Sequence, residues 1–327
     1  MDDVARLAGV SRALVSLVMR SSPRVSARSR QLVLDAAAQL GYRPNLMARN
    51  LAARRTTTIG LVLNDLHNPF FAELADGVLA AADAAGYSVI LASARRSAAL
   101  EARALDTLLA SRVDGIVVAG SRLPRARVAK AAESVPMVSI ARALRVSGVG
   151  SVCTDEAAGA ALAIAHLHEL GHRRIAHIDG GRGAGSAARR SGYLAAMRAS
   201  GLGDAACVVG GEYTETAGAH AMHALLRSAL PPTAVFAAND LSAIGAIDLI
   251  EREHCNVPTD VSMIGFDNTA LSGLNHIGLT TVAQPSTAMG RRATEMLVGN
   301  LNGDAPLEHV VMAPQLVLRG TTCRPAT

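Results

Sequence analysis

The chain has no tryptophan, a single lysine and few aromatic residues. Without tryptophan, no ligand can stack on an indole ring, and an aromatic share of 2% leaves alanine, valine, leucine and isoleucine to fill the cores. The lysine, Lys130, lies in the segment RVAKAAE. A Walker A phosphate loop needs a lysine directly after its second glycine, so the sequence excludes this class of nucleotide site.

Cysteine is sparse as well. Cys153, Cys207, Cys255 and Cys323 stand far apart and show no metal-finger spacing, which is typical of reduced thiols in a cytosolic protein. No apolar run approaches the roughly 18–20 residues that cross a bilayer, and the first residues lack the apolar segment of a signal peptide. We therefore expect a cytoplasmic protein without a membrane partner.

Signatures of catalysis and metal binding are also missing. No G-x-S-x-G segment occurs, and GGRGAGS, residues 180–186, has serine where a dinucleotide loop needs its third glycine. His166, His168 and His172 are close in sequence, but residues two apart on a helix point in different directions. We expect no catalytic residue, no cofactor and no metal, and nothing indicates an enzyme.

The chain does have a basic first segment. Residues 1–55 hold ten arginines against three aspartates, a formal charge of +7, whereas the whole chain of 327 residues carries +5 and the remainder therefore −2. A basic head on a nearly neutral body indicates that the head meets a polyanion. A solvated charged face would give the same count.

This segment has the pattern of three short helices. In VARLAGVSRALVSLVMR, residues 4–20, Asp2 or Asp3 can cap the first helix, Gly9 can end it in the left-handed conformation, and Ser11 can cap the second. Two short helices joined by a glycine turn form a helix-turn-helix. The expected core of the head is Val4, Leu7, Ala8, Leu14 or Val15, Val18, Leu32, Val33, Ala36, Ala37 and Leu40.

The second helix carries residues suited to reading DNA. Near its N-terminus, Arg12 can pair with guanine, and Ala13 or Leu17 can touch a thymine methyl group. Arg24 and Arg28 are expected to bind phosphates, which gives affinity without sequence selection. A helical bundle with incidental arginines is the alternative. The candidate DNA contacts in this segment are Ser11, Arg12, Ala13, Ser16, Leu17, Arg24 and Arg28.

From Ile59 onward, the chain alternates apolar runs of strand length with alanine-rich helical stretches, as in IGLVLN, DGIVVAG and VSMIGFD. This alternation predicts parallel sheets covered on both faces, and the number of units favours two doubly wound lobes. Ligands of such sheets bind outside the carboxyl ends of the strands, where Asn64, Ser121, Asn239 and Asp267 stand. Each of these residues alone could instead be a helix cap.

The head resembles a known family. DVARLAGVS, residues 3–11, followed by residues 25–51, is similar to the DNA-binding head of the lactose-repressor (LacI/GalR) family. The resemblance implies that residues 43–56 are a hinge that becomes helical on DNA and pushes Leu51 into the minor groove. Pro44 suits a first helical turn, and an apolar wedge flanked by arginines is typical of proteins that kink the minor groove. The candidate hinge contacts are Asn45, Arg49, Leu51 and Arg54.

The resemblance continues through the body, in segments such as residues 68–87, 236–247 and 261–269. They look like the effector domain of the same family, whose fold resembles that of periplasmic sugar-binding proteins. Matching positions imply that Phe70, Phe71, Arg189, Asn239 and Asp267 face an effector, and Tyr213 and Phe236 are candidate ring partners. The candidate effector residues are Asn64, Phe70, Phe71, Ser121, Arg189, Tyr213, Phe236, Asn239, Asp267 and Gln284.

Some positions depart from the family pattern. Leu14, Leu17 and Arg20 stand where threonine, arginine and asparagine are usual, so the resemblance does not carry over an operator sequence. Ala141 takes the place of a common aspartate, which counts against a standard sugar pocket.

The expected α/β organisation has three parts. Residues 1–43 form the helix-turn-helix head, residues 44–57 the hinge, and residues 58–327 an effector-binding and dimerisation domain. Within that domain, the first lobe is expected to hold residues 58–157 plus 285–327, and the second residues 158–284.

The resemblance implies a sequence-specific transcriptional regulator, expected to be a repressor. It would bind a double-stranded operator with an inverted repeat as a homodimer, and a small effector such as a sugar would bind between the lobes. The alternatives are a cytoplasmic small-molecule-binding protein of the periplasmic type without operator function, and an α/β enzyme. A DNA affinity that falls steeply with salt would separate the regulator from both.

Overall fold

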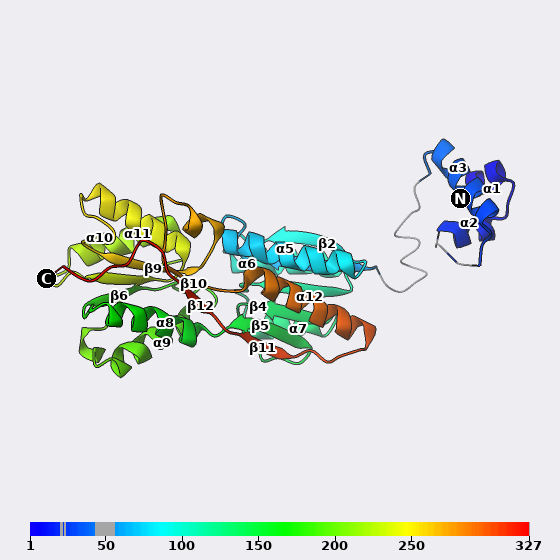
Figure 1. Ribbon diagram of the computed structural model, residues 1–327. Coiled ribbons are helices and arrows are strands. Elements are labelled where there is room, and N and C mark those ends of the chain that lie inside the picture. The colour runs from blue at the N-terminus through cyan, green and yellow to red at the C-terminus, as the bar shows by residue number, and fades with distance from the viewer. Residues whose placement is uncertain (20–21, 23, 43–55, 327) are drawn as a thin grey trace. The chain divides into compact units, whose positions relative to one another are not determined.

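The computed structural model describes residues 1–19, 22, 24–42 and 56–326. The chain divides into two compact units, residues 1–56 and 57–327 (Figure 1). The residues expected to form the hinge lie almost entirely outside the described ranges. No helix within the described ranges is long and apolar enough to cross a bilayer.

The first unit is the expected three-helix head. Gly9 ends the first helix at φ +63° and turns the chain into the second, and the Ser11 side chain accepts a hydrogen bond from the Leu14 amide at 3.2 Å. Ser26 caps the third helix by accepting from the Ser29 amide. The helices are α1 (Asp2–Ala8), α2 (Arg12–Met19) and α3 (Ala27–Gln39).

The core of the head is smaller than expected. It is formed by Val4, Ala5, Val15, Val18, Val33, Ala36 and Ala37. Three leucines expected in this core are about half exposed: Leu7 is 51%, Leu32 47% and Leu40 47% exposed. Three short helices have a large surface for their volume, so they bury only a small core. Asp2 and Asp3 do not cap α1, since Met1 holds the cap position and both aspartates lie in the first turn.

The second unit contains two doubly wound lobes, as the alternating pattern predicts. The first lobe has a sheet of parallel strands in the order β11-β5-β4-β3-β1-β2. Helices α5 and α12 cover one face of this sheet, and α6 and α7 cover the other. Its elements are β1 (Thr58–Leu63), α5 (Pro69–Ala84), β2 (Ser88–Ser93), α6 (Ala98–Ala110), β3 (Gly115–Ala119), α7 (Arg125–Ala132), β4 (Met137–Ile140), β5 (Val149–Thr154), α12 (Ser286–Asn302) and β11 (His309–Met312).

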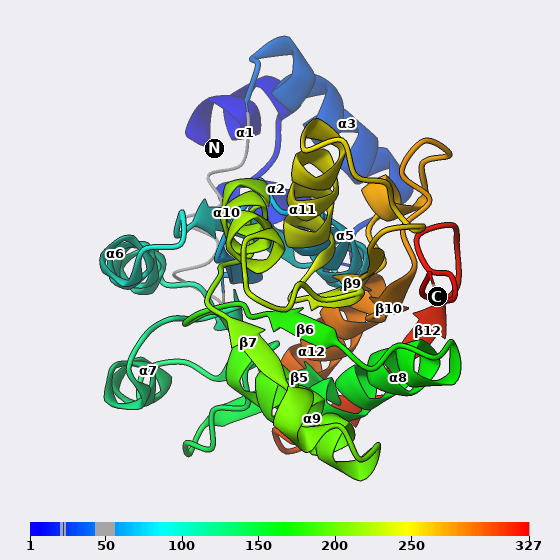
Figure 2. The same ribbon diagram turned by 90° about the vertical axis from the view of Figure 1, so that its left-hand side faces the viewer.

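The second lobe repeats this architecture with the strand order β12-β10-β9-β8-β6-β7. Helices α8 and α9 lie on one face of the sheet and α10 and α11 on the other, as Figure 2 shows. Its elements are α8 (Glu156–Glu169), β6 (Ile175–Ile178), α9 (Ser186–Ala199), η1 (Gly203–Ala205), β7 (Cys207–Val209), α10 (Glu215–Leu226), β8 (Ala234–Ala237), α11 (Asp240–Arg252), β9 (Ser262–Asp267), η2 (Ala270–Gly273), β10 (Thr281–Ala283) and β12 (Gln315–Val317).

The end of the chain departs from the expected arrangement. Strand β12 pairs antiparallel with β10, so the second sheet is not purely parallel. The Thr321 carbonyl accepts from the Met263 amide at 2.7 Å, and the Cys323 amide donates to Ser262 Oγ at 3.1 Å. Residues 315–323 therefore belong to the second lobe, contrary to the expected placement of all of residues 285–327 in the first.

Glycines allow the closest helix crossing in the first lobe. A Cβ atom on Gly77 of α5 would lie 2.0 Å from the Thr287 carbonyl oxygen of α12, and one on Gly290 would lie 2.1 Å from the Leu74 carbonyl oxygen. The two backbones are therefore in contact, with no room for a side chain between them.

Gly77→Ala is expected to lower the free energy of unfolding by about 1–3 kcal/mol, because α12 must move to admit the new methyl group. Gly299→Ala is the matched control, since its Cβ would approach nothing nearer than Ala305 Cβ at 3.9 Å. The control should be neutral or slightly stabilising, because alanine is the better helix former. Urea denaturation measures both, and an unchanged Gly77→Ala midpoint would contradict the argument.

Candidate DNA-binding face and effector site

The outer face of α2 is available to a partner. Arg12 and Ala13 are exposed and Ser16 and Leu17 are half-buried, whereas Val15 on the opposite side is fully buried. This division follows from the helical period, which turns residues three or four apart, such as Val15 and Val18, inward to the core.

The arginines of the head differ in their surroundings. Arg24 and Arg28 are exposed. Arg12 Nε lies 3.6 Å from Asp2 Oδ1, but both side chains are largely exposed, so this pair holds Arg12 only weakly. The other candidate DNA contacts, Asn45, Arg49, Leu51 and Arg54, lie outside the described residues.

In the second unit, the carboxyl ends of strands from both lobes meet at one small cavity. Its volume is about 30 Å³. Seven of the ten candidate effector residues line it, because parallel strands direct their following loops to the same edge of the sheet. The lining residues are Asn64, Asn68, Phe70, Phe71, Ala141, Glu156, Ala184, Arg189, Tyr213, Asp267 and Gln284.

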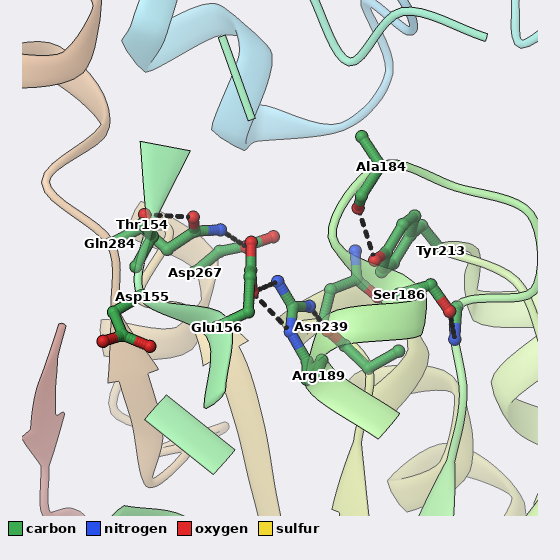
Figure 3. Close-up of polar contacts among 12 residues, drawn as sticks. Thr154, Asp155, Glu156, Ala184, Ser186, Arg189, Tyr213, Asn239, Asp267 and Gln284 are labelled. Carbon is green, nitrogen blue, oxygen red and sulfur yellow. Dashed lines mark hydrogen bonds and ion pairs between the residues drawn. The ribbon is translucent and has the colours of Figure 1, made fainter. Parts of the chain in front are cut away.

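A buried ion pair forms one wall of this cavity. Arg189 Nε and Nη2 donate to Glu156 Oε2 at 3.0 and 2.6 Å, and Arg189 Nη1 donates to the Ala238 carbonyl. The guanidinium also lies 3.5 Å from the centre of the Phe266 ring. The side chains of Arg189 and Glu156 are 3% and 8% exposed, so water screens their charges little (Figure 3).

A chain of hydrogen bonds crosses from the first lobe to the second beside this pair. Thr154 Oγ1 donates to Gln284 Oε1 at 2.7 Å, and Gln284 Nε2 donates to Asp267 Oδ1 at 2.7 Å. Asp267 has φ +118°, an uncommon conformation that turns its carboxyl group toward the cavity. Burial raises the pKa of Asp267 well above its usual range, and the charge of Asp240 raises it further.

Asp240 is a second buried carboxyl group that interacts electrostatically with Asp267. Its carboxyl group accepts hydrogen bonds from Thr281 Oγ1 at 2.5 Å, from the Thr269 amide at 2.7 Å and from Thr269 Oγ1 at 2.9 Å. Burial raises the pKa of Asp240 to about 6 despite these bonds. Two buried carboxyl groups therefore stand close together, and each disfavours the ionised form of the other.

The glycine-rich segment 180–186 shapes the rim of the cavity. A Cβ on Gly180 or Gly183 would lie 2.4 or 2.2 Å from atoms of the Tyr213 ring, and one on Gly185 would lie 2.5 Å from Glu156 Oε1. Tyr213 Oη donates to the Ala184 carbonyl at 2.8 Å. These glycines let the backbone pass over Tyr213 and Glu156, which is a packing role.

Three candidate effector residues lie elsewhere. Phe236 is fully buried in the core, with its ring 4.9 Å from that of His177, because it stands inside β8 and not at the strand end. Ser121 donates to the Glu101 carboxylate and lines a larger cavity beside this one. Asn239 caps α11 by accepting from the Ser242 amide at 2.9 Å, and its buried Nδ2 has no hydrogen-bond partner.

Sequence reasoning missed Glu156. The preceding residue, Asp155, caps α8 by accepting a hydrogen bond from the Ala158 amide at 2.9 Å. A glutamate directly after a cap is usually a solvated residue that favours the helix dipole. Only the fold brings it to Arg189, which lies in α9.

The polar groups of the cavity are mainly acceptors. Asn64 Oδ1 is buried without a hydrogen-bond partner. Glu156 and Asp267, which carry carboxyl groups, line the same cavity. Such a set suits a ligand that donates several hydrogen bonds, as hydroxyl groups do. Among the residues that the structure describes, no group of three or more histidine, cysteine, aspartate or glutamate side chains could hold a metal ion.

Both units match known protein families in sequence. Residues 1–45 match the family described as "Bacterial regulatory proteins, lacI family", and residues 164–322 match a "Periplasmic binding protein-like domain". The transcriptional repressor CytR of Escherichia coli K12 is 34% identical over 330 residues, which cover 98% of this chain and 96% of CytR.

Solved structures are similar over the same length. A lac repressor dimer bound to operator and the anti-inducer ONPF is 28% identical with a TM-score of 0.87, and 98% of each chain is covered. A complex of the transcriptional regulator CelR with cellobiose is 32% identical with a TM-score of 0.73, again over 98% of each chain.

Proposed function

The chain belongs to the LacI family of bacterial regulatory proteins and is a DNA-binding transcriptional regulator, and from this premise we propose how its two units divide the work. Residues 1–56 bind an operator, and residues 57–327 hold the effector that controls this binding. The regulator acts as a repressor. The observation that carries the proposal is the exposed outer face of α2 on a basic head, attached to a two-lobed unit with a polar cavity at its strand ends.

In the head, α2 enters the major groove. Arg12 and Ala13 contact base edges near the N-terminus of the helix, and Arg24 and Arg28 bind phosphates. Arg49, Leu51 and the neighbouring hinge residues act in the minor groove, as the family resemblance implies. Because Leu17 replaces the usual arginine, the operator of this protein differs in sequence from those of relatives that keep it.

The regulator binds as a homodimer. The similar lac repressor is a dimer on its operator, and two heads related by a two-fold axis would read an inverted repeat in successive major grooves. A regulator that reads chromosomal DNA works in the cytoplasm of a bacterium.

The effector is a small hydroxyl-rich molecule of the sugar class, since the similar CelR holds cellobiose. Asn64, Arg189 and Asp267 bind its polar groups, and Phe70 and Tyr213 bind its apolar face. A cavity of about 30 Å³ admits little more than a water molecule. Ligand pockets measure roughly 300–1,000 Å³. The lobes must therefore separate to admit the effector, and this movement couples effector binding to the heads.

The experiment that tests the proposal is a titration of operator selected from a random DNA pool, read by mobility shift at 50 and 200 mM salt. The affinity is expected to fall more than tenfold between these concentrations, because several arginine–phosphate contacts release counterions. A small-molecule-binding protein without operator function, or an enzyme, would give no retarded complex at either concentration. The similar proteins are transcriptional regulators, which favours operator binding over an enzymatic function.

A further inference from the structure

A second, larger cavity adjoins the small one between the lobes. Its volume is about 1130 Å³. It shares the lining residues Ala141, Glu156 and Ala184 with the small cavity, so the two are neighbours. We call it the outer groove. Its volume is slightly above the roughly 300–1,000 Å³ of ligand pockets, so it can hold a small molecule but not a folded partner.

The outer groove is rich in arginine. Arg122, Arg125, Arg142 and Arg182 line it. Arg125, on the first turn of α7, and Arg182, in the glycine-rich loop, come from different lobes, are exposed, and form no ion pair with the described residues. Their guanidinium groups can therefore bind an anion in the groove, one from each lobe.

The other two arginines, Arg142 and Arg122, differ in how they are held. Arg142 Nη1 donates to the Ser121 and Leu123 carbonyls at 3.0 and 2.7 Å. Arg122 Nε is buried without a hydrogen-bond partner, and the Arg122 amide donates to Glu101 Oε2 at 2.8 Å.

The charge balance of the outer groove is positive. Its four arginines face only two unmatched carboxylates, that of Glu101 beneath them and that of Asp155 on the wall, which leaves two positive charges. A fifth arginine at the rim, Arg96, pairs with two carboxylates, those of Asp65 and Glu212, at 3.5 and 3.6 Å, which reduces the excess to one positive charge. A phosphate monoester has three terminal oxygens that accept hydrogen bonds, so Arg125 and Arg182 can bind it from both lobes at once, and its charge of about −1.5 to −2 at neutral pH is attracted by the positive groove.

The small cavity cannot take the same anion. Its one arginine, Arg189, uses all three nitrogens on Glu156 and the Ala238 carbonyl. A phosphate there would have to displace a buried carboxylate and would stand beside Asp267. An anionic group of the effector is therefore accommodated in the outer groove alone.

We propose that the effector is a sugar phosphate, or a similar polyhydroxylated phosphate monoester. Its hydroxyl groups enter the small cavity, and its phosphate binds the arginines of the outer groove. Arginine suits this role because its planar fork of N–H groups binds phosphate oxygens in pairs. The inference rests on the proposed function, since it uses the same effector site.

The test compares matched probes on the full-length protein: glucose with glucose 6-phosphate, ribose with ribose 5-phosphate, and fructose with fructose 6-phosphate, by isothermal titration calorimetry. In at least one pair, the phosphorylated member is expected to bind at least tenfold more tightly. The Arg125→Ala/Arg182→Ala variant should lose this preference. Arg227→Ala, which removes an exposed arginine at the end of α10 that lines neither cavity, should keep it.

Inorganic phosphate provides a second arm that needs no knowledge of the sugar. Its stabilisation of the second unit against heat should require at least tenfold more phosphate in the double variant than in wild type or Arg227→Ala. The basic head is the same in all three proteins, so the difference reports the outer groove.

The outcomes separate the two proposals. A neutral sugar that binds as tightly as its phosphate, or equal phosphate sensitivity in all three proteins, would overturn the sugar-phosphate inference and leave the effector site standing. Failure of all six sugars alongside a clear phosphate difference would support the outer groove and reject the sugar class in the proposed function.

Discussion

Replacement of Arg189 by methionine is expected to lower the free energy of unfolding of the second unit by about 3–5 kcal/mol. Arg189 and Glu156 form a pair whose side chains are 3% and 8% exposed. Removal of the cation leaves the carboxylate of Glu156 buried without its partner, and a lone buried charge is among the costliest defects in a protein. Urea denaturation followed by circular dichroism measures the change.

Two control variants isolate the cause. Glu156→Leu combined with Arg189→Met removes both charges and should recover most of the lost stability, because apolar side chains can replace a buried ion pair at little cost. Arg190→Met removes the neighbouring arginine, which is half-exposed and pairs with Asp179 at 3.2 Å. The carboxylate of Asp179 is only 6% exposed, but it keeps the hydrogen bonds from the Gly181 and Gly211 amides, so this variant should cost no more than about 1–2 kcal/mol. Equal losses for Arg189→Met and Arg190→Met would contradict the role of burial.

The double variant also tests the effector site without the complication of instability. It should bind operator as wild type does, since the head is unchanged, but it should no longer respond to effector. The measurement is operator release in a mobility-shift titration with the effector that acts on wild type. A response that survives in the stable double variant would place the effector elsewhere.

The sequence predicts the layers of the second unit and the place of its site for a clear physical reason. Strands buried on both faces must be apolar throughout, so β1, β3 and β9 read as uninterrupted runs. The polar residue that follows each run must then lie at the sheet edge. Asn64 and Asp267 meet at the cavity for this reason.

Contacts between segments far apart in the sequence could not be predicted in this way. Glu156 and Arg189 are brought together only by the packing of α8 on α9. Phe236 shows the converse, because an aromatic residue in an apolar strand has the same pattern whether it faces a ligand or the core. Strand β12 was missed because three residues carry too short a pattern to be recognised.

The head shows a limit of a different kind. The helical period correctly selected Val4, Val18 and Val33 as buried. It also selected Leu7 and Leu40, which lie toward the edges of the same stripes and are about half exposed. Periodicity gives the direction in which a side chain points, but the size of the neighbouring helices decides how much of the stripe is covered.

A negative charge on the outer face of α2 should have the largest effect on DNA binding. Ala13→Glu is expected to weaken operator binding about a hundredfold, or about 2.8 kcal/mol, because it places a carboxylate against the DNA. Ala13 is exposed, and glutamate is a good helix former, so the head should fold normally.

Ala38→Glu makes the same substitution at an exposed position of α3 and changes the net charge equally. Its effect on the protein's overall attraction to DNA is therefore the same, and any further loss in Ala13→Glu reports contact through α2. We expect Ala38→Glu to weaken binding less than fivefold in a mobility-shift titration at 100 mM salt. Equal losses in the two variants would mean that charge alone acts and that α2 does not enter the groove, whereas a greater loss in Ala38→Glu would assign the reading of DNA to α3.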